Sequence, residues 1–117
     1  MYQLATCSTC KRIRAELGEQ PELTVVDIKT QPLSAAQVDR MAELAGSYEA
    51  IFTRRSRQYR ARGLHEQELT EADYRRLILD EYTFLKRPVT TVGDRIFVGN
   101  AKKTVADLRA ALAGATP

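Results

Sequence analysis

Two cysteines, Cys7 and Cys10, stand two residues apart in the stretch ATCSTCKRI, and the 117-residue chain has no others. A disulfide between them would close a very short loop and restrict the unfolded chain little. A closed zinc site needs four Cys or His ligands, and His65 is the only histidine. A C-x-x-C pair between a strand and a helix indicates thiol redox chemistry. Two incidental thiols, or a zinc ion shared in a dimer, remain open alternatives.

The position of the pair assigns different roles to the two thiols. Cys7 is expected between the first strand and the first helix, where free backbone N–H groups and the helix dipole favour a thiolate. Lys11, Arg12 and Arg14 add positive charge nearby. Cys10 falls one turn into the helix, where solvent reaches it less easily. We therefore predict that Cys7 is the nucleophile, with a lowered pKa, and that Cys10 resolves.

Two further segments suit the binding of an anion. Arg87-Pro88 places a cation before a strand, at a position where proline cannot donate to the sheet. Residues 53–62 hold five arginines. A solvated helix face explains such a run most simply, and an oxyanion clamp built from one guanidinium comes second. Direct nucleic-acid binding ranks third, because only Tyr59 could stack on a base and no groove-reading motif stands out.

A fold must position these residues. Hydrophobic periodicity, together with the start and stop signals of helices and strands, predicts its elements. The predicted elements are strands at 2–6, 23–28, 89–92 and 95–98, and helices at 9–17, 34–45, 53–62, from 70 to just before Pro88, and after a cap at Asn100. Capping boxes are expected at Ser34/Gln37 and Thr70/Asp73. The order predicts an α/β fold with one mixed sheet of about four strands. Residues 1–117 would form a single domain with a helical insertion at about 31–86.

Composition narrows the functional classes. Hydrophobic residues make up 44% of the chain and charged residues 28%, which suits a soluble protein with a real core. No apolar run approaches the ~20 residues of a membrane-spanning helix, and the first residues lack the features of a signal peptide. We expect a cytoplasmic protein without membrane contact. The net charge of +3 fits an anionic substrate without requiring one.

The segments TCSTCKRIRAEL, DIKTQPLS, FTRRSRQY and LKRPVTTVGDRIFVGN, in this order over nearly the whole chain, resemble the ArsC/Spx family. This family includes glutaredoxin-linked arsenate reductases, YffB-like proteins and Spx regulators. The resemblance implies a thioredoxin-like fold. It also implies the following roles: Cys7 as nucleophile, Cys10 at the second motif position, Lys11, Arg54 and Arg87 as anion-binding residues, and Pro88 as a cis-proline facing Cys7.

The resemblance further implies a thiol-dependent oxidoreductase that acts on an oxyanion such as arsenate, or on a disulfide. Its electron donor would be glutathione or glutaredoxin, with no bound cofactor and no metal. One departure stands out. Arsenate reductases of this type resemble one another in a third anion-binding arginine, and the matching position here is Val98. Lys102 and Lys103 follow nearby.

A second class of function also fits the resemblance. An Spx-like regulator would use the Cys7/Cys10 pair as a redox switch and would bind RNA polymerase. Gly46 matches a glycine that Spx proteins use for that contact, although it is also the expected C-cap of the preceding helix. A thioredoxin-like domain without efficient turnover is the third alternative.

Overall fold

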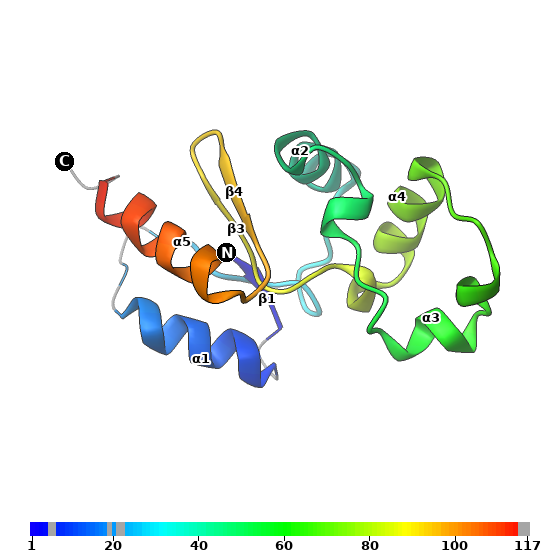
Figure 1. Cartoon of the computed structure of the whole chain (residues 1–117), viewed down its shortest axis with the longest axis horizontal. Helices are drawn as coiled ribbons and strands as arrows, with labels where there is room; N and C mark the ends of the chain where they lie inside the picture. Colours follow the sequence, from blue (N-terminus) through cyan, green and yellow to red (C-terminus); the bar gives the residue numbers. More distant parts are fainter. Residues whose placement is uncertain (5–6, 19, 21–22, 115–117) are drawn as a thin grey trace. The chain divides into compact units, whose positions relative to one another are not determined.

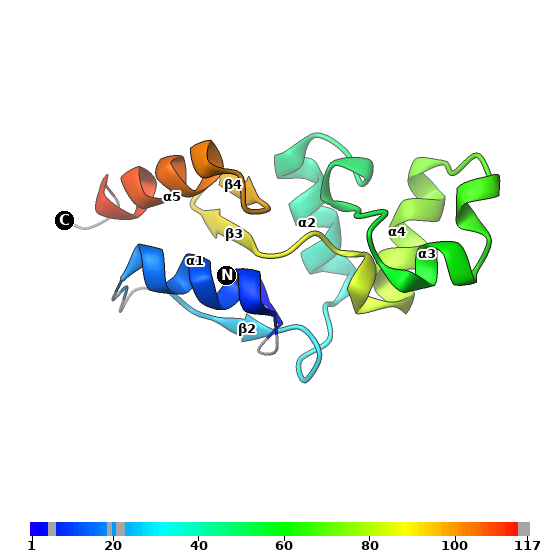
Figure 2. The same cartoon turned by 60° about the horizontal axis from the view of Figure 1, so that its bottom comes forward.

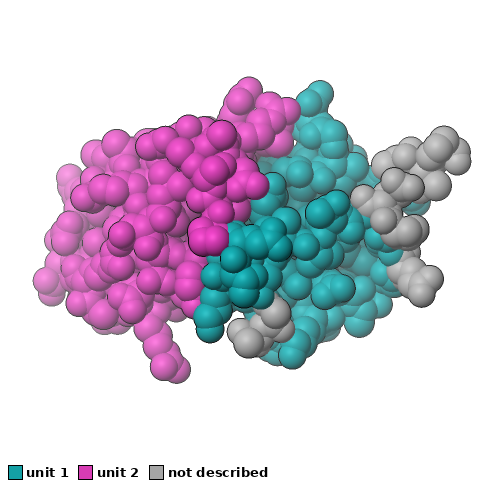
Figure 3. All heavy atoms as spheres, turned by 180° about the vertical axis from the view of Figure 1, so that it is seen from behind, with its two compact units in different colours: residues 1–31, 87–117 teal, residues 32–86 magenta. Residues whose placement is uncertain are grey.

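The computed structural model describes residues 1–4, 7–18, 20 and 23–114, and the chain divides into two compact units. The first comprises residues 1–31 and 87–117, and the second residues 32–86; Figure 3 shows them in teal and magenta. The second unit holds helices and short turns of helix. That the whole chain acts as a single domain stays a prediction.

The first unit is built on a four-stranded mixed sheet with the order β2-β1-β3-β4. Its strands are β1 (Tyr2–Gln3), β2 (Val26–Asp27), β3 (Val89–Val92) and β4 (Arg95–Val98), shown in Figures 1 and 2. Strand β1 runs parallel to β2 and antiparallel to β3. Strands β3 and β4 form the predicted hairpin, in which Gly93 has the positive φ of 59° that the first turn position needs. The mixed sheet confirms the predicted α/β class.

Both N-terminal strands are shorter than predicted. Strand β2 begins at Val26 instead of Leu23, whose N–H donates to the carbonyl of Gln20 (2.9 Å) and not to a neighbouring strand. Strand β1 ends at Gln3, and the last two residues of the predicted strand, 5 and 6, lie outside the described residues.

Helices α1 (Ser8–Leu17) and α5 (Lys102–Gly114) pack together and supply the core of this unit. The core side chains are Met1, Ile13, Leu17, Phe97, Val105, Leu108 and Leu112. Burying one such side chain contributes about 1.5–3 kcal/mol. The predicted Asn100 cap is wrong by one residue. The Val105 N–H donates to the carbonyl of Ala101 (3.0 Å), which makes Ala101 the N-cap residue of α5.

The second unit contains α2 (Ala35–Ala45), α3 (Arg57–Ala61) and α4 (Glu71–Asp80). Short 3₁₀ turns stand between them: η1 (Glu49–Ile51), η2 (Leu64–Glu66) and η3 (Tyr82–Phe84). Both capping boxes form as predicted, at Ser34 and at Thr70. Gly46 ends α2 in the left-handed conformation (φ 101°), where a side chain would be strained. The C-cap therefore accounts for this glycine.

Two helices differ from their predicted bounds for local reasons. Helix α3 spans five residues because Ser56, whose hydroxyl accepts from the Gln58 N–H (3.2 Å), caps it only there. Helix α4 ends at Asp80, well before Pro88. Glu81 is extended (φ −140°, ψ 111°), and its carboxylate accepts from the Thr83 N–H to begin η3.

A short antiparallel ladder joins two segments of this unit, the one that follows η1 and the one that follows η3. Phe52 pairs with Leu85, the Thr53 N–H donates to Phe84 (2.8 Å), and the Lys86 N–H donates to Ile51 (2.8 Å). Phe52 also stacks on Phe84, with ring centroids 5.2 Å apart. The ladder fixes the backbone that leads to Arg54 and to Lys86.

Candidate active site

Cys7 is the N-cap residue of α1, in an extended conformation (φ −79°, ψ 116°). Its N–H donates to the Leu4 carbonyl (3.1 Å), and its own carbonyl accepts from Lys11 (3.1 Å), which is the first bond of the helix. The Cys7 side chain makes no capping hydrogen bond. The free N–H groups in the first turn of α1 therefore face the sulfur of Cys7, and not the side-chain oxygen that usually caps a helix.

The backbone around Cys7 favours its thiolate. Burial alone would raise the pKa of this thiol. That effect is outweighed by hydrogen bonds from the Cys10 N–H, the Cys10 thiol and the Thr9 N–H, and by the charge of Arg87, so the pKa is lowered. Residues 9 and 10 are the second and third positions of the helix, whose N–H groups a cap residue normally satisfies. These N–H groups therefore favour the ionised form of the Cys7 sulfur.

Cys10 has the opposite environment. Its side chain is completely buried, and burial, together with the neighbouring Cys7 thiolate, raises its pKa to about 11. Both cysteines are free thiols within hydrogen-bonding reach of each other. The pair therefore consists of a partly exposed, acidic outer sulfur and a buried, protonated inner one.

Arg87 and Pro88 belong to the same unit as the two cysteines. The Arg87–Pro88 peptide bond is cis, as the resemblance implies, and Pro88 is fully buried. The Pro88 carbonyl accepts from the Gly99 N–H (2.9 Å), and the next residue, Val89, pairs with Val98 across the hairpin. The structure brings Cys7, Cys10 and the charge of Arg87 together.

The basic side chains of α1 have different surroundings. Arg12 forms a loose ion pair with Glu16 (3.9 Å). Lys11 is exposed and, with Arg14 and Leu23, lines a hollow of about 380 Å³. Its part in anion binding stays a prediction.

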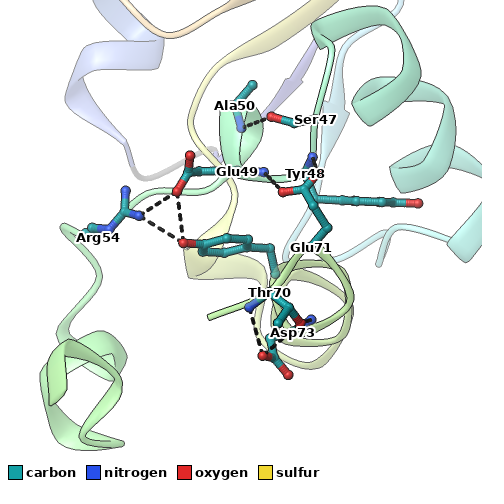
Figure 4. Close-up of polar contacts among 9 residues, drawn as sticks. Ser47, Tyr48, Glu49, Ala50, Arg54, Thr70, Glu71 and Asp73 are labelled. Carbon is teal, nitrogen blue, oxygen red and sulfur yellow. Dashed lines mark hydrogen bonds and ion pairs between the residues drawn. The ribbon is translucent and has the colours of Figure 1, made fainter. Parts of the chain in front are cut away.

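Arg54 lies in the second unit, where it already has two partners. Its Nη2 donates to Glu49 Oε2 (2.9 Å), as Figure 4 shows, and to the Tyr74 hydroxyl (2.9 Å), and that hydroxyl donates to the same carboxylate oxygen (3.0 Å). The pKa of Glu49 is lowered by the bonds from Arg54 and Tyr74. Its role as an anion-binding residue also stays a prediction.

The sequence did not indicate these partners of Arg54. Tyr74 was predicted only as an apolar-face residue of its helix, and it is indeed buried. Glu49 precedes Arg54 by five residues across a 3₁₀ turn, which is no helical spacing. Only the placement of both on neighbouring elements reveals the contact.

Other residues singled out in the sequence have simpler surroundings. His65 lies 3.7 Å from the Glu66 carboxylate and near the ring of Tyr59. Lys103 forms an ion pair with Asp107 (3.5 Å). No cluster of three or more His, Cys, Asp or Glu side chains suited to a metal ion occurs in the described residues. Nor does the described part contain a helix with the length and apolar character to cross a membrane.

The family model of the ArsC family matches residues 2–108 of the chain. The protein belongs to the ArsC family. Among solved structures, the YFFB protein is similar to this ArsC-family chain at 25% identity, with a TM-score of 0.78 over 95% of this chain and 96% of that one. A possible arsenate reductase from Streptococcus mutans is 27% identical, with a TM-score of 0.71 over 92% and 93% of the two chains.

A curated relative is the uncharacterized protein YusI of Bacillus subtilis, 28% identical over 102 residues, which cover 84% of this chain and 86% of that protein. The matches to solved structures confirm the predicted thioredoxin-like fold of this ArsC-family member. Both the cysteines and Arg87-Pro88 lie within the range that the family model matches.

Proposed function

We propose that this ArsC-family protein is a thiol-dependent reductase of an oxyanion, with arsenate as the first candidate, or of a disulfide. One observation carries the proposal: Cys7 is the N-cap residue of α1, with a lowered pKa to which the Cys10 and Thr9 N–H groups and the buried Cys10 thiol contribute. A thiolate so placed is a nucleophile, and the N–H groups that stabilise it also attract an anionic substrate.

The residues suggest a sequence of two steps. The Cys7 thiolate attacks arsenic and displaces hydroxide, which leaves as water after protonation, so that a sulfur–arsenic bond forms. A second thiol then attacks the Cys7 sulfur. The sulfur–arsenic bond breaks, its electron pair passes to arsenic and reduces As(V) to As(III), and Cys7 is left in a disulfide.

The second thiol is Cys10 or glutathione. Attack by Cys10 gives an internal Cys7–Cys10 disulfide, which two external thiols, from glutathione or glutaredoxin, reduce to regenerate the enzyme. Attack by glutathione gives a mixed disulfide on Cys7. The raised pKa of Cys10 means that its proton must leave during its attack, so that this route is slow at neutral pH unless a base assists.

Positive groups stabilise the charge that develops on the oxyanion. Arg87 acts on the Cys7 sulfur and is suited to bind the arsenate oxygens there. The family resemblance adds Arg54 and Lys11. Val98, in place of a third arginine, predicts weaker arsenate binding than in relatives that carry the arginine.

The experiment is steady-state arsenate reduction with glutathione and glutaredoxin, with a small disulfide as a parallel substrate. Cys7→Ser should abolish turnover of both substrates. Cys10→Ser should retain arsenate turnover if glutathione releases the product, and should lose it if Cys10 does. If the wild-type protein turns over neither substrate, the proposal is contradicted. Oxidation-dependent co-purification with RNA polymerase would then favour a regulator.

A further inference from the structure

Two buried side-chain oxygens of the first unit have no hydrogen-bond partner among the described residues: Gln3 Oε1 in β1 and Thr90 Oγ1 in β3. The two residues are 5% and 0% exposed. Buried polar atoms are nearly always hydrogen-bonded, because one that is left without a partner destabilises the folded state. Two such acceptors in one small sheet therefore point to a donor that both of them can serve.

Both side chains lie on the same face of the sheet. Tyr2 pairs with Val89 across the antiparallel strands β1 and β3. Because side chains alternate along a strand, Gln3 and Thr90, each next to one member of this pair, point to the other face. Thr90 also pairs with Phe97, whose side chain belongs to the core shared with α1 and α5. The two unpartnered oxygens thus lie on the face that these helices cover.

The buried thiol of Cys10 lies at the same end of this face. Met1 packs in the core with side chains from the later turns of α1. The backbone of Leu4, three residues further along the chain, forms a hydrogen bond with the Cys10 sulfur. Helix α1 therefore runs back along β1, and Gln3, the residue before Leu4, lies beside its first turns. Thr90 flanks Gln3 from the neighbouring strand.

The Cys10 thiol needs a new acceptor when Cys7 reacts. In the free protein the Cys10 thiol donates its hydrogen to the Cys7 sulfur. Once Cys7 carries arsenic or glutathione, its sulfur is no longer ionised, and the Cys10 thiol loses this acceptor. The hydrogen must also point away from Cys7 before a lone pair of the Cys10 sulfur can attack it. Acceptors that are free in the resting protein, on the other side of Cys10 from Cys7, meet this need.

We propose that Gln3 and Thr90 are positioning residues for the resolving step: they accept the hydrogen of the Cys10 thiol while Cys7 carries its covalent partner, and so turn a sulfur lone pair toward Cys7. The inference rests on the proposed function, because it requires that Cys10 resolve. With glutathione on Cys7, the Cys10 sulfur bonds to the Cys7 sulfur, and the bond between Cys7 and glutathione breaks. Its electron pair leaves on the glutathione thiolate, which takes up from solvent the proton that Cys10 gives up.

The test is a single-turnover measurement on the full chain. Cys7 is converted to its mixed disulfide with glutathione at low pH, where exchange is slow, and the pH is then raised to neutral. Mass spectrometry of acid-quenched samples follows the loss of glutathione as the internal disulfide forms. Thr90→Val and Gln3→Met keep the approximate shape and remove the acceptor. Each should slow this step about three- to tenfold, the range expected for the loss of one hydrogen bond.

Two controls show whether the effect belongs to the resolving step. Alkylation of Cys7 in the reduced variants should keep its wild-type rate, because Gln3 and Thr90 act only after Cys7 has reacted. Thr91→Val is the matched variant, since Thr91 is the next residue of β3 and its side chain points to the other face of the sheet. A wild-type resolving rate in both Thr90→Val and Gln3→Met, or equal slowing in Thr91→Val, would overturn the inference.

Stability gives an independent check on the resting protein. Thr90→Val should not lower the urea midpoint of unfolding of the reduced chain, because it removes a buried oxygen that has no partner there. A clear loss of stability would mean that the hydroxyl is already hydrogen-bonded in the resting state, and the inference would be wrong.

The wild-type protein separates this inference from the proposed function. If no internal disulfide forms after Cys7 is loaded, Cys10 does not resolve and the inference falls, whereas arsenate reduction with release by external glutathione would stand. If the internal disulfide forms at the same rate in the wild type and in every variant, Cys10 keeps its role and only the part of Gln3 and Thr90 is wrong.

Discussion

The helices of the two units begin in opposite ways. In the second unit, α2 and α4 start with complete capping boxes, in which Ser34 or Thr70 accepts from the N–H of the third helical residue and a side chain returns the bond. In the first unit, the N-cap residue of α1 is Cys7, whose side chain makes no such bond. The contrast shows where the protein gives up helix stability to keep N–H groups available for a negative charge.

The same contrast extends to the charged side chains. Arginines of the second unit meet carboxylates at short distances, as in Arg75 with Asp39 (2.7 Å) and Arg62 with Asp80 (2.6 Å). The charge of Arg87 in the first unit instead acts on a sulfur that is negative only when ionised. Short ion pairs hold these arginines in the second unit, whereas Arg87 in the first unit helps to make a thiol acidic.

The largest expected effect concerns the two thiols themselves. At pH 7, iodoacetamide should modify Cys7 at least about a hundredfold faster than Cys10. An ordinary thiol has a pKa of ~8.5; the pKa of Cys7 is lowered and that of Cys10 is raised to about 11, so their thiolate fractions differ by that factor or more, and Cys10 is also buried. Mass spectrometry of timed digests measures both rates. Comparable rates at the two sites would show that the outer and the inner sulfur do not differ in acidity and exposure as described.

The pH dependence has a defined sign. The rate of Cys7 modification should rise with pH through a midpoint below the ordinary thiol range and then remain level, because the thiolate is already complete. Cys10 should begin to react only as the pH approaches about 11. A single midpoint near 8.5 for Cys7 would be that of an unperturbed thiol and would contradict the capping role of the sulfur.

The next effect tests the helix starts. Ser34→Ala and Thr70→Ala should each lower the free energy of unfolding by about 1 kcal/mol, because each removes a capping oxygen. Cys7→Ser should instead raise it, by up to about 1 kcal/mol, while abolishing activity, since a hydroxyl caps the N–H groups of α1 without ionisation. Urea denaturation monitored by circular dichroism measures all three. A loss of stability in Cys7→Ser would mean that α1 needs the sulfur for packing.

A smaller effect ranks the causes of Cys7 acidity. Replacing Cys10 by Ala should raise the pKa of Cys7, because the Cys10 thiol donates to the Cys7 sulfur, and Cys10→Ser should largely restore it. Alkylation rates measured against pH give both values. A lower pKa in Cys10→Ala would show that the buried thiol opposes the thiolate instead.

The smallest effect is expected at Arg87, because its charge lowers the pKa of Cys7 less than the hydrogen bonds from Cys10 and Thr9 do. Arg87→Gln should raise the pKa of Cys7 by less than Cys10→Ala does. Arg109→Gln, which removes an exposed charge from α5 of the same unit, should leave it unchanged. Equal shifts in the two arginine variants would reduce the role of Arg87 to general charge.

Local signals in the sequence were enough to predict those structural features that depend only on nearby residues. The boxes at Ser34 and Thr70, the glycine end of α2 and the Gly93 hairpin turn depend on neighbours within a few residues, and all appear as predicted. The early end of α4 could not be predicted, because it depends on the extended conformation of Glu81 and on the ladder that follows.

The candidate site divides along the same line. The placement of Cys7 at a helix start follows from a strand, a turn and an apolar stripe, all visible in the sequence. The partners of Arg54 depend on contacts between η1 and α4, more than twenty residues apart, and no periodicity joins Glu49 to Tyr74. A long-range polar contact between side chains of different elements leaves no such pattern.

The burial of Cys10 beneath Cys7 has a consequence for damage by peroxide. A thiol with a lowered pKa, such as Cys7, is readily oxidised to a sulfenic acid, and further oxidation to the sulfinic acid is irreversible in most proteins. The inner thiol can condense with the sulfenic acid, expel water and store the oxidised sulfur as a reducible disulfide. Sheltered from the oxidant by its own burial, Cys10 keeps the exposed sulfur recoverable.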